Sequence, residues 1–459
     1  MSLDYKPDSS FFSKGISHVV NEANDSIDLY ENQERLSYLF NSLPGSENPG
    51  IVISQIEKIV NRKEIPLDVV LFESKGIENL IECLKSSSTV VCRASLHCIY
   101  IIMLKSTFPH KVLLSNLHSF VRIMRGPSLM PFVCMILIEV VEHLPQASNT
   151  LLKNEHIIAL VLSLLDHQVS KTMTGFLLLL LSRVWKKAKK SMVYIRETQY
   201  GVTFERRLIS FLHNYVLYCS LDDIWVLYPS LCLFESCIKH WNDDCSIIIP
   251  NSVIYKLIEL TDKTSSAGSN SLLPVIIEVW NIIVIKYFNE LVLLDVIDVI
   301  IQILLRHCEI DKAPISRILF FFCNVSATNE GSRIIISHDI FGSAYEMYSS
   351  FSMSSKENLL FLFMNLLLNC FETMTNSTSF SSIFADCIDF VTCSISPDYS
   401  LVFLKSIEMI NQQNSKILTD MDYYCIENAL NDLIGSSETR VSSKAIIIKK
   451  LIEETNNVY

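Results

Sequence analysis

The segment from Ile65 to Ile101 decides the fold, and it reads IPLDVVLFESKGIENLIECLKSSSTVVCRASLHCIYI. Two short apolar stretches meet at Gly76, and the second, GIENLIECL, is amphipathic. A polar run of serines ends at Ser88, and the run TVVCRASLHCIYIIML follows it. Its apolar residues stand at i, i+3, i+4 and i+7, the spacing of one face of an α-helix. The segment therefore predicts short helices followed by a longer one.

The same pattern recurs along the chain. Amphipathic stretches such as HIIALVLSLL lead up to short polar or helix-breaking clusters, and apolar runs such as QVSKTMTGFLLLLLSRV follow them. The clusters lie roughly 40 residues apart, with one interval near 55. They centre near Pro49, Ser88, Pro127, His167, Asp222, Gly268, Glu309, Ser354, Pro397 and Ser437. Because each unit can bury its apolar face only against its neighbours, we expect an all-α, right-handed α-solenoid superhelix of about ten repeats.

The composition argues against several function classes. The chain has 459 residues, and 38 Lys and Arg against 49 Asp and Glu give a formal net charge of −11. Coating nucleic acid requires a net basic surface, so we expect no nucleic-acid partner. Only 11 glycines are present, whereas nucleotide-binding α/β enzymes and β-sandwiches use glycine at their turns. The acidic balance suits a partner that carries Lys or Arg.

Neither a membrane span nor a disulfide framework is expected. The most apolar runs are interrupted by charged or polar residues before the roughly 18 residues that a spanning helix needs. The first residues, MSLDYKPDSSFFSKG, lack the layout of a signal peptide. The 14 cysteines are scattered singly, with no C-x-x-C, which is typical of packed helices in a reducing compartment.

The sequence predicts two parts of unequal size. Residues 1–45 are acidic and are expected to form a partly disordered tail and a capping helix. Residues 46–459 are expected to form the repeat solenoid, with a basic insert over 185–207. The insert is interpreted as a solvated loop or an extended helix end. In the alternative interpretation, Lys186, Lys187, Lys189 and Lys190 form a nuclear-import-type peptide or contact a phosphate group.

Signatures of catalysis and metal binding are absent from the sequence. No G-x-S-x-G, P-loop, G-x-G-x-x-G, H-E-x-x-H or EF-hand loop occurs. The 11 histidines are dispersed and are interpreted as core or surface residues. We therefore expect no enzyme, no catalytic residues, no metal site and no cofactor.

Three segments carry a resemblance to known repeat proteins. The segment from Ile65 to Ile101 resembles an armadillo repeat, with its short first helix, turn glycine, Leu-rich second helix and a third helix carrying Ala94. The segment ISRILFFFCNVSATNEGSRIIISHDIFGSAYEMY, Ile315 to Tyr348, resembles the importin-α (karyopherin-α) family more specifically. The segment from Cys425 to Glu454 is similar to that family's short final repeat.

The resemblance implies a groove that binds an extended basic peptide. In that family, asparagines on successive third helices clamp the peptide backbone, and a tryptophan four residues earlier packs against Lys or Arg stems. The matching asparagines here are Asn281, Asn324 and Asn365, and the tryptophan positions of the last two hold Phe320 and Phe361. The alternative is structural: the asparagines bond to neighbouring loops and the phenylalanines are core residues.

Three functions remain open at the level of the sequence. The first is an importin-α-like adaptor for nuclear localisation signals, cytoplasmic and nuclear, that takes part in nuclear import. The acidic N-terminal residues lack the basic segment with which that family binds importin-β, so that partner is not supported. The second is an armadillo scaffold for one dedicated protein partner, and the third is a structural subunit of a permanent complex.

Overall fold

The structure is a computed structural model. It describes residues 29–61, 65–126, 128–144, 146–153, 160–161, 163–165, 170–188, 212–240, 249–266, 272–293, 295–308, 314–377, 379–393, 396–420 and 423–456. Every regular element within these ranges is a helix. None of these helices combines the length and the apolar character that crossing a bilayer would require. The chain divides into two compact units, Met1–Thr150 and Leu151–Tyr459.

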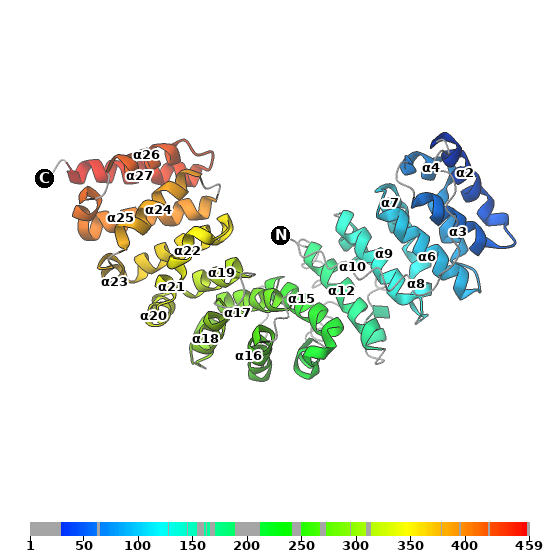
Figure 1. The fold of residues 1–459 in the computed structure, drawn as a ribbon, viewed down its shortest axis with the longest axis horizontal. Helices are drawn as coiled ribbons and strands as arrows, with labels where there is room; N and C mark the ends of the chain where they lie inside the picture. The colour runs from blue at the N-terminus through cyan, green and yellow to red at the C-terminus, as the bar shows by residue number, and fades with distance from the viewer. Residues whose placement is uncertain are drawn as a thin grey trace. The chain divides into compact units, whose positions relative to one another are not determined.

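Unit 1 is a stack of helices in which the longer ones pack on each other. The long helices α3, α6 and α9 follow one another, α3 against α6 and α6 against α9. Helix α2 packs on α3, α4 and α5, and α4 packs on α7 (Figure 1). The bounds are α2 (Leu29–Ser42), η1 (Leu43–Gly45), α3 (Pro49–Val60), α4 (Leu67–Ser74), α5 (Gly76–Cys83), α6 (Thr89–Met103), α7 (Phe108–Ser115), α8 (Leu117–Met124) and α9 (Met130–His143). Helix α10 (Ala147–Lys153) spans the boundary between the two units.

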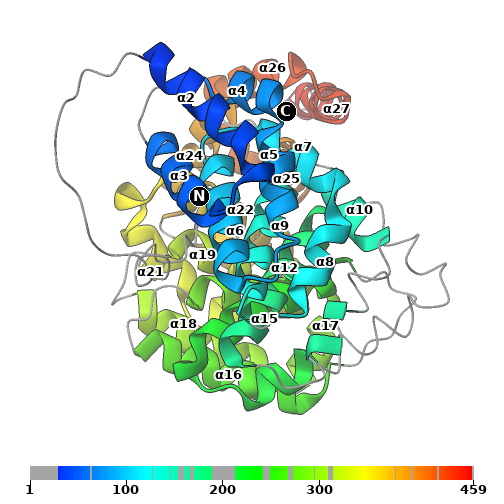
Figure 2. The same ribbon diagram turned by 90° about the vertical axis from the view of Figure 1, so that its right-hand side faces the viewer.

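Unit 2 repeats this arrangement. Its long helices pack in chain order, α12 on α15, then α17, α19, α22, α25 and α27. The helices that lie between them in the chain form a second layer, in which α16 packs on α18 (Figure 1, Figure 2). The first bounds are α12 (Lys171–Lys187), η2 (Leu221–Asp223), α15 (Ile224–His240), α16 (Asn251–Ser266), α17 (Leu273–Leu293), α18 (Val296–Cys308) and α19 (Ile315–Val325). The remaining bounds are α20 (Asn329–Ser337), α21 (Ile340–Glu346), η3 (Tyr348–Ser350), α22 (Met353–Asn369), α23 (Phe371–Thr375), α24 (Phe380–Cys393), α25 (Pro397–Asp420), α26 (Tyr423–Ile434) and α27 (Thr439–Asn456).

The polar clusters of the sequence mark the beginnings of long helices. Ser88 caps α6 by accepting a hydrogen bond from the backbone N–H of Val91, and Ser352 caps α22 in the same way. The clusters near Pro49, Asp222, Pro397 and Ser437 fall at or just before the first residues of α3, α15, α25 and α27. The other four centres, Pro127, His167, Gly268 and Glu309, lie outside the described residues.

The predicted tail and insert are only partly described. Residues 1–28 lie outside the described ranges, and α2, inside the predicted cap, packs on α3, α4 and α5. Of the basic insert 185–207, the structure describes residues 185–188, so Lys189 and Lys190 fall outside it. Lys186 and Lys187 are exposed in the last turn of α12.

Candidate functional site

The predicted site residues lie on three consecutive long helices of unit 2. Asn281 is on α17, Asn324 is on α19 and Asn365 is on α22, and these helices pack on one another in that order. The side-chain amide of Asn324 donates a 2.8 Å hydrogen bond to Oδ1 of Asn281. Asn365 donates from Nδ2 to the carbonyl oxygen of Cys323 (3.1 Å) and to Oγ of Ser326 (3.2 Å). All three asparagines therefore bond from one long helix to the next.

The three asparagines differ in how much of the side chain can reach solvent. Asn281 is 2% exposed and Asn365 is 8% exposed, whereas Asn324 is half-buried. Nδ2 of Asn281 is buried and has no hydrogen-bond partner among the described residues. Asn324 is thus the member of the trio that reaches solvent, and the bond from its Nδ2 to Oδ1 of Asn281 orients its side-chain amide.

Around these residues the long helices present a partly exposed side. On α15 the incompletely buried positions Trp225, Tyr228, Cys232, Glu235 and Lys239 recur at helical spacing. We call this side the long-helix face, and its large apolar members are Trp225 and Tyr228 on α15, Ile282 and Ile285 on α17, Phe320 on α19 and Phe361 on α22. Trp225, Ile285 and Phe320 are 43%, 65% and 44% exposed, and Phe361 is half-buried.

Charged side chains of α12, α15, α17 and α19 interact around Glu235. Nε of Arg317 lies 3.3 Å from Oε1 of Glu278, which joins α19 to α17. Burial raises the pKa of Glu235 on α15, and the nearby Lys186 partly offsets this effect. Burial likewise raises the pKa of Tyr228 to about 12. Lys186 lies on α12, so charged groups from α12, α17 and α19 all act on the carboxylate of Glu235 on α15.

Trp280, which stands beside Asn281 in the sequence, belongs to the core. Its side chain is fully buried, and its indole N–H donates a 3.0 Å hydrogen bond to Oγ1 of Thr261 on α16. It therefore ties the two layers of unit 2 together and does not contribute to the long-helix face.

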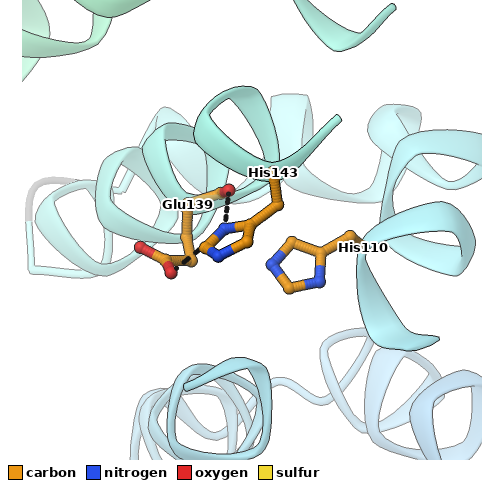
Figure 3. Close-up of side chains that lie close together, drawn as sticks. All are labelled: His110, Glu139 and His143. Carbon is orange, nitrogen blue, oxygen red and sulfur yellow. Dashed lines mark hydrogen bonds and ion pairs between the residues drawn. The ribbon is translucent and has the colours of Figure 1, made fainter. Parts of the chain in front are cut away.

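Sequence reasoning missed a second cluster, in unit 1. His110 on α7 and Glu139 and His143 on α9 bring potential metal-ligand atoms within 4.8 Å of one another (Figure 3). Glu139 and His143 are four residues apart, which places both on one side of a helix. That spacing was the available signal, but no sequence pattern connects the pair to His110.

The comparisons with known proteins give a fold and no family. The sequence matches no protein-family model and no curated protein. An engineered protein is similar in structure over 91% of this chain and 99% of its own, with a TM-score of 0.63 and 12% identity.

Two natural repeat proteins are also similar in structure. A chain from a study of the phosphorylation switch that controls the interaction between cadherin and beta-catenin has a TM-score of 0.53 at 11% identity, and the likeness covers 93% of this chain and 96% of that one. Importin beta, crystallised in a polyethylene glycol condition, has a TM-score of 0.52 at 12% identity, covering 96% of this chain and 64% of that one. The predicted all-α solenoid of the armadillo or HEAT kind is thereby confirmed. Membership of the importin-α family stays a prediction.

Proposed function

We propose that this protein is a repeat scaffold that binds a segment of a protein partner on the long-helix face of unit 2. Repeat solenoids offer extended surfaces of this kind, built from equivalent positions on successive units. The similar structures of beta-catenin and importin beta support a protein-binding role in general terms.

One observation carries the proposal. Three successive long helices each expose a large apolar side chain on the long-helix face: Trp225, Ile285 and Phe320. Exposed apolar side chains rimmed by polar groups are typical of interaction sites, and Trp and Tyr are the residue types that most often dominate binding energy. The paired charges of Glu278 and Arg317 would select the register of the partner.

A displayed library of random peptides, selected against the purified full chain, tests this proposal. We expect the selected peptides to lose at least tenfold in affinity for Phe320→Ser and to bind Tyr255→Ser as they bind the wild type. Tyr255 is the matched control because it is an exposed aromatic residue (56%) on α16, in the other layer. Peptides that bind both variants equally would place the binding surface elsewhere.

A second candidate is the importin-α-like adaptor that binds basic, nuclear-localisation-type segments in nuclear import. Its specific support is that Asn324 lies four residues, one helical turn, after the exposed Phe320 on α19, with the carboxylates of Glu235 and Glu278 on the same face. The amide would bond to the peptide backbone, and the ring would carry a Lys or Arg stem.

A fluorescent nuclear-localisation peptide at two salt concentrations separates the two candidates. A basic-peptide groove predicts binding that weakens as salt screens the charges and that weakens about tenfold in Asn324→Ala. Absence of binding at both salt concentrations would reject the adaptor and leave the general scaffold, which the displayed library tests independently.

A further inference from the structure

The cluster of His110, Glu139 and His143 lies in unit 1 and is separate from the long-helix face. His110 is the third residue of α7, and Glu139 and His143 lie one turn apart near the end of α9, which packs on α7. The two imidazole rings are 4.6 Å apart between centroids. Figure 3 shows His110 reaching across from α7 toward the two side chains of α9.

The hydrogen bond of His110 determines which of its ring nitrogens has a lone pair available for a metal ion. Its Nδ1 lies 3.0 Å from the carbonyl oxygen of Thr107. A carbonyl oxygen only accepts, so Nδ1 carries the proton and Nε2 carries a lone pair. Metal-bound histidines are usually oriented by this same bond from the other ring nitrogen to a carbonyl.

Nε2 of His110 is an unsatisfied acceptor in the core. The side chain is fully buried, and Nε2 has no hydrogen-bond partner among the described residues. The lone pair of this buried imidazole faces a second histidine and a carboxylate. No described residue donates a hydrogen bond to it, so a metal ion is the partner that this arrangement fits.

The other two side chains complete a ligand set of two nitrogens and one oxygen. Nδ1 of His143 lies 3.1 Å from the carbonyl oxygen of Glu139 and 3.3 Å from its Oε1. Bonds of about 2.1 Å to a tetrahedral ion would separate ligand atoms by about 3.4 Å. The present separations, within 4.8 Å, need only small side-chain rotations, and His143 is 45% exposed, so it can rotate.

We propose that His110, Glu139 and His143 form a binding site for a divalent transition-metal ion of the zinc class. Two imidazoles and one carboxylate suit Zn²⁺, whereas Mg²⁺ and Ca²⁺ require mostly oxygen ligands. Three protein ligands leave a fourth position for water or for an outside ligand. Because the ligands come from α7 and α9, the ion joins two helices of unit 1 and stabilises that unit.

The test is a zinc titration of the reduced, chelator-treated full chain against a chromogenic zinc chelator. We expect one tightly bound equivalent in the wild type and in His118→Gln, and at least tenfold weaker binding of that equivalent in His143→Gln. His118 is the matched control because it is an exposed histidine on α8 in the same unit. The cysteines are the same in all three proteins, so any adventitious zinc binding by thiols cancels and only a difference between variants counts.

A second readout guards against a variant that merely folds poorly. Zn²⁺ should raise the thermal midpoint of the wild type and of His118→Gln but not that of His143→Gln, whose exposed side chain contributes little to packing. Equal zinc affinity in His143→Gln and wild type would overturn the proposal. An equal stabilisation by Mg²⁺ would overturn the assignment to the zinc class.

Discussion

Asn324 donates its side-chain amide to Oδ1 of Asn281 at 2.8 Å, so two residues 43 positions apart join the long helices α19 and α17. The same kind of link continues at the next step, where Asn365 bonds to the carbonyl oxygen of Cys323. Asn369 adds a 2.8 Å bond to the carbonyl oxygen of Ser326. In-phase asparagines therefore have a structural role in this solenoid, whatever they contribute to binding.

The Asn281–Asn324 bond should be measurable as a coupling free energy. We expect Asn324→Ala to lower the free energy of unfolding by about 1–3 kcal/mol, because it leaves the buried side-chain oxygen of Asn281 without its hydrogen-bond donor. A double-mutant cycle with Asn281→Ala should give a coupling of about 0.5–1.5 kcal/mol in urea unfolding. Asn289→Ala, at an exposed position of α17, serves as the control and should change stability by less than about 0.5 kcal/mol. Strictly additive single effects would contradict the bond.

The fold was predictable because its signals are local. The serine run ending at Ser88 predicted where α6 begins, and the side chain of Ser88 caps that helix. Gly76 was predicted at a turn, and a β-carbon there would lie only 2.9 Å from the ring of Phe40. The periodicity within one repeat predicts where its helices lie, and the repetition along the chain predicts that each repeat stacks on its neighbours.

The environment of the site residues was not predictable, because it depends on contacts between repeats. The 43-residue spacing of Asn281 and Asn324 gave their phase, but not the fact that one amide bonds to the other. The trio of His110, Glu139 and His143 comes from two helices. No sequence motif joins the three residues, so the sequence alone does not predict that they lie close together.

Gly175 should be essential to the packing of α12 on α15. A β-carbon at this position would lie 2.0 Å from the carbonyl oxygen of Trp225, and backbone cannot move aside as a side chain can. We expect Gly175→Ala to destabilise the protein by about 1–3 kcal/mol despite the better helix propensity of alanine. Thr172→Ala on the same helix should be neutral or slightly stabilising. Urea unfolding of both variants checks this, and equal stabilities would contradict the close approach.

Glu235 should make stability depend on pH in a defined direction. Burial raises its pKa in the folded protein, with Lys186, Lys239 and Arg317 acting against the shift and Glu278 adding to it. Between the ordinary and the raised pKa, the native state binds more protons than the unfolded chain, so the free energy of unfolding falls as the pH rises.

Replacing Glu235 by glutamine removes this penalty. We expect Glu235→Gln to be more stable than the wild type at neutral pH, with a difference that shrinks toward zero as the pH approaches about 4. Unfolding midpoints measured across this range check the prediction, with the exposed Glu346→Gln as the control. A wild type that gains stability relative to Glu235→Gln as the pH rises would reverse the sign and refute it.

Phe320 and Phe321 offer a comparison between neighbours that separates binding from stability. They are adjacent on α19, yet Phe320 is 44% exposed and Phe321 is fully buried. We expect Phe321→Ala to destabilise the protein by about 3–5 kcal/mol through the cavity it leaves. Phe320→Ala should lower the free energy of unfolding by less than about 1 kcal/mol, because its ring already contacts water. Urea unfolding of the two variants gives both values. An exposed aromatic ring that adds little to the stability of the fold is available to a partner. Equal losses of stability in the two variants would mean that Phe320 is packed like its neighbour, and the long-helix face would then lack its central aromatic residue.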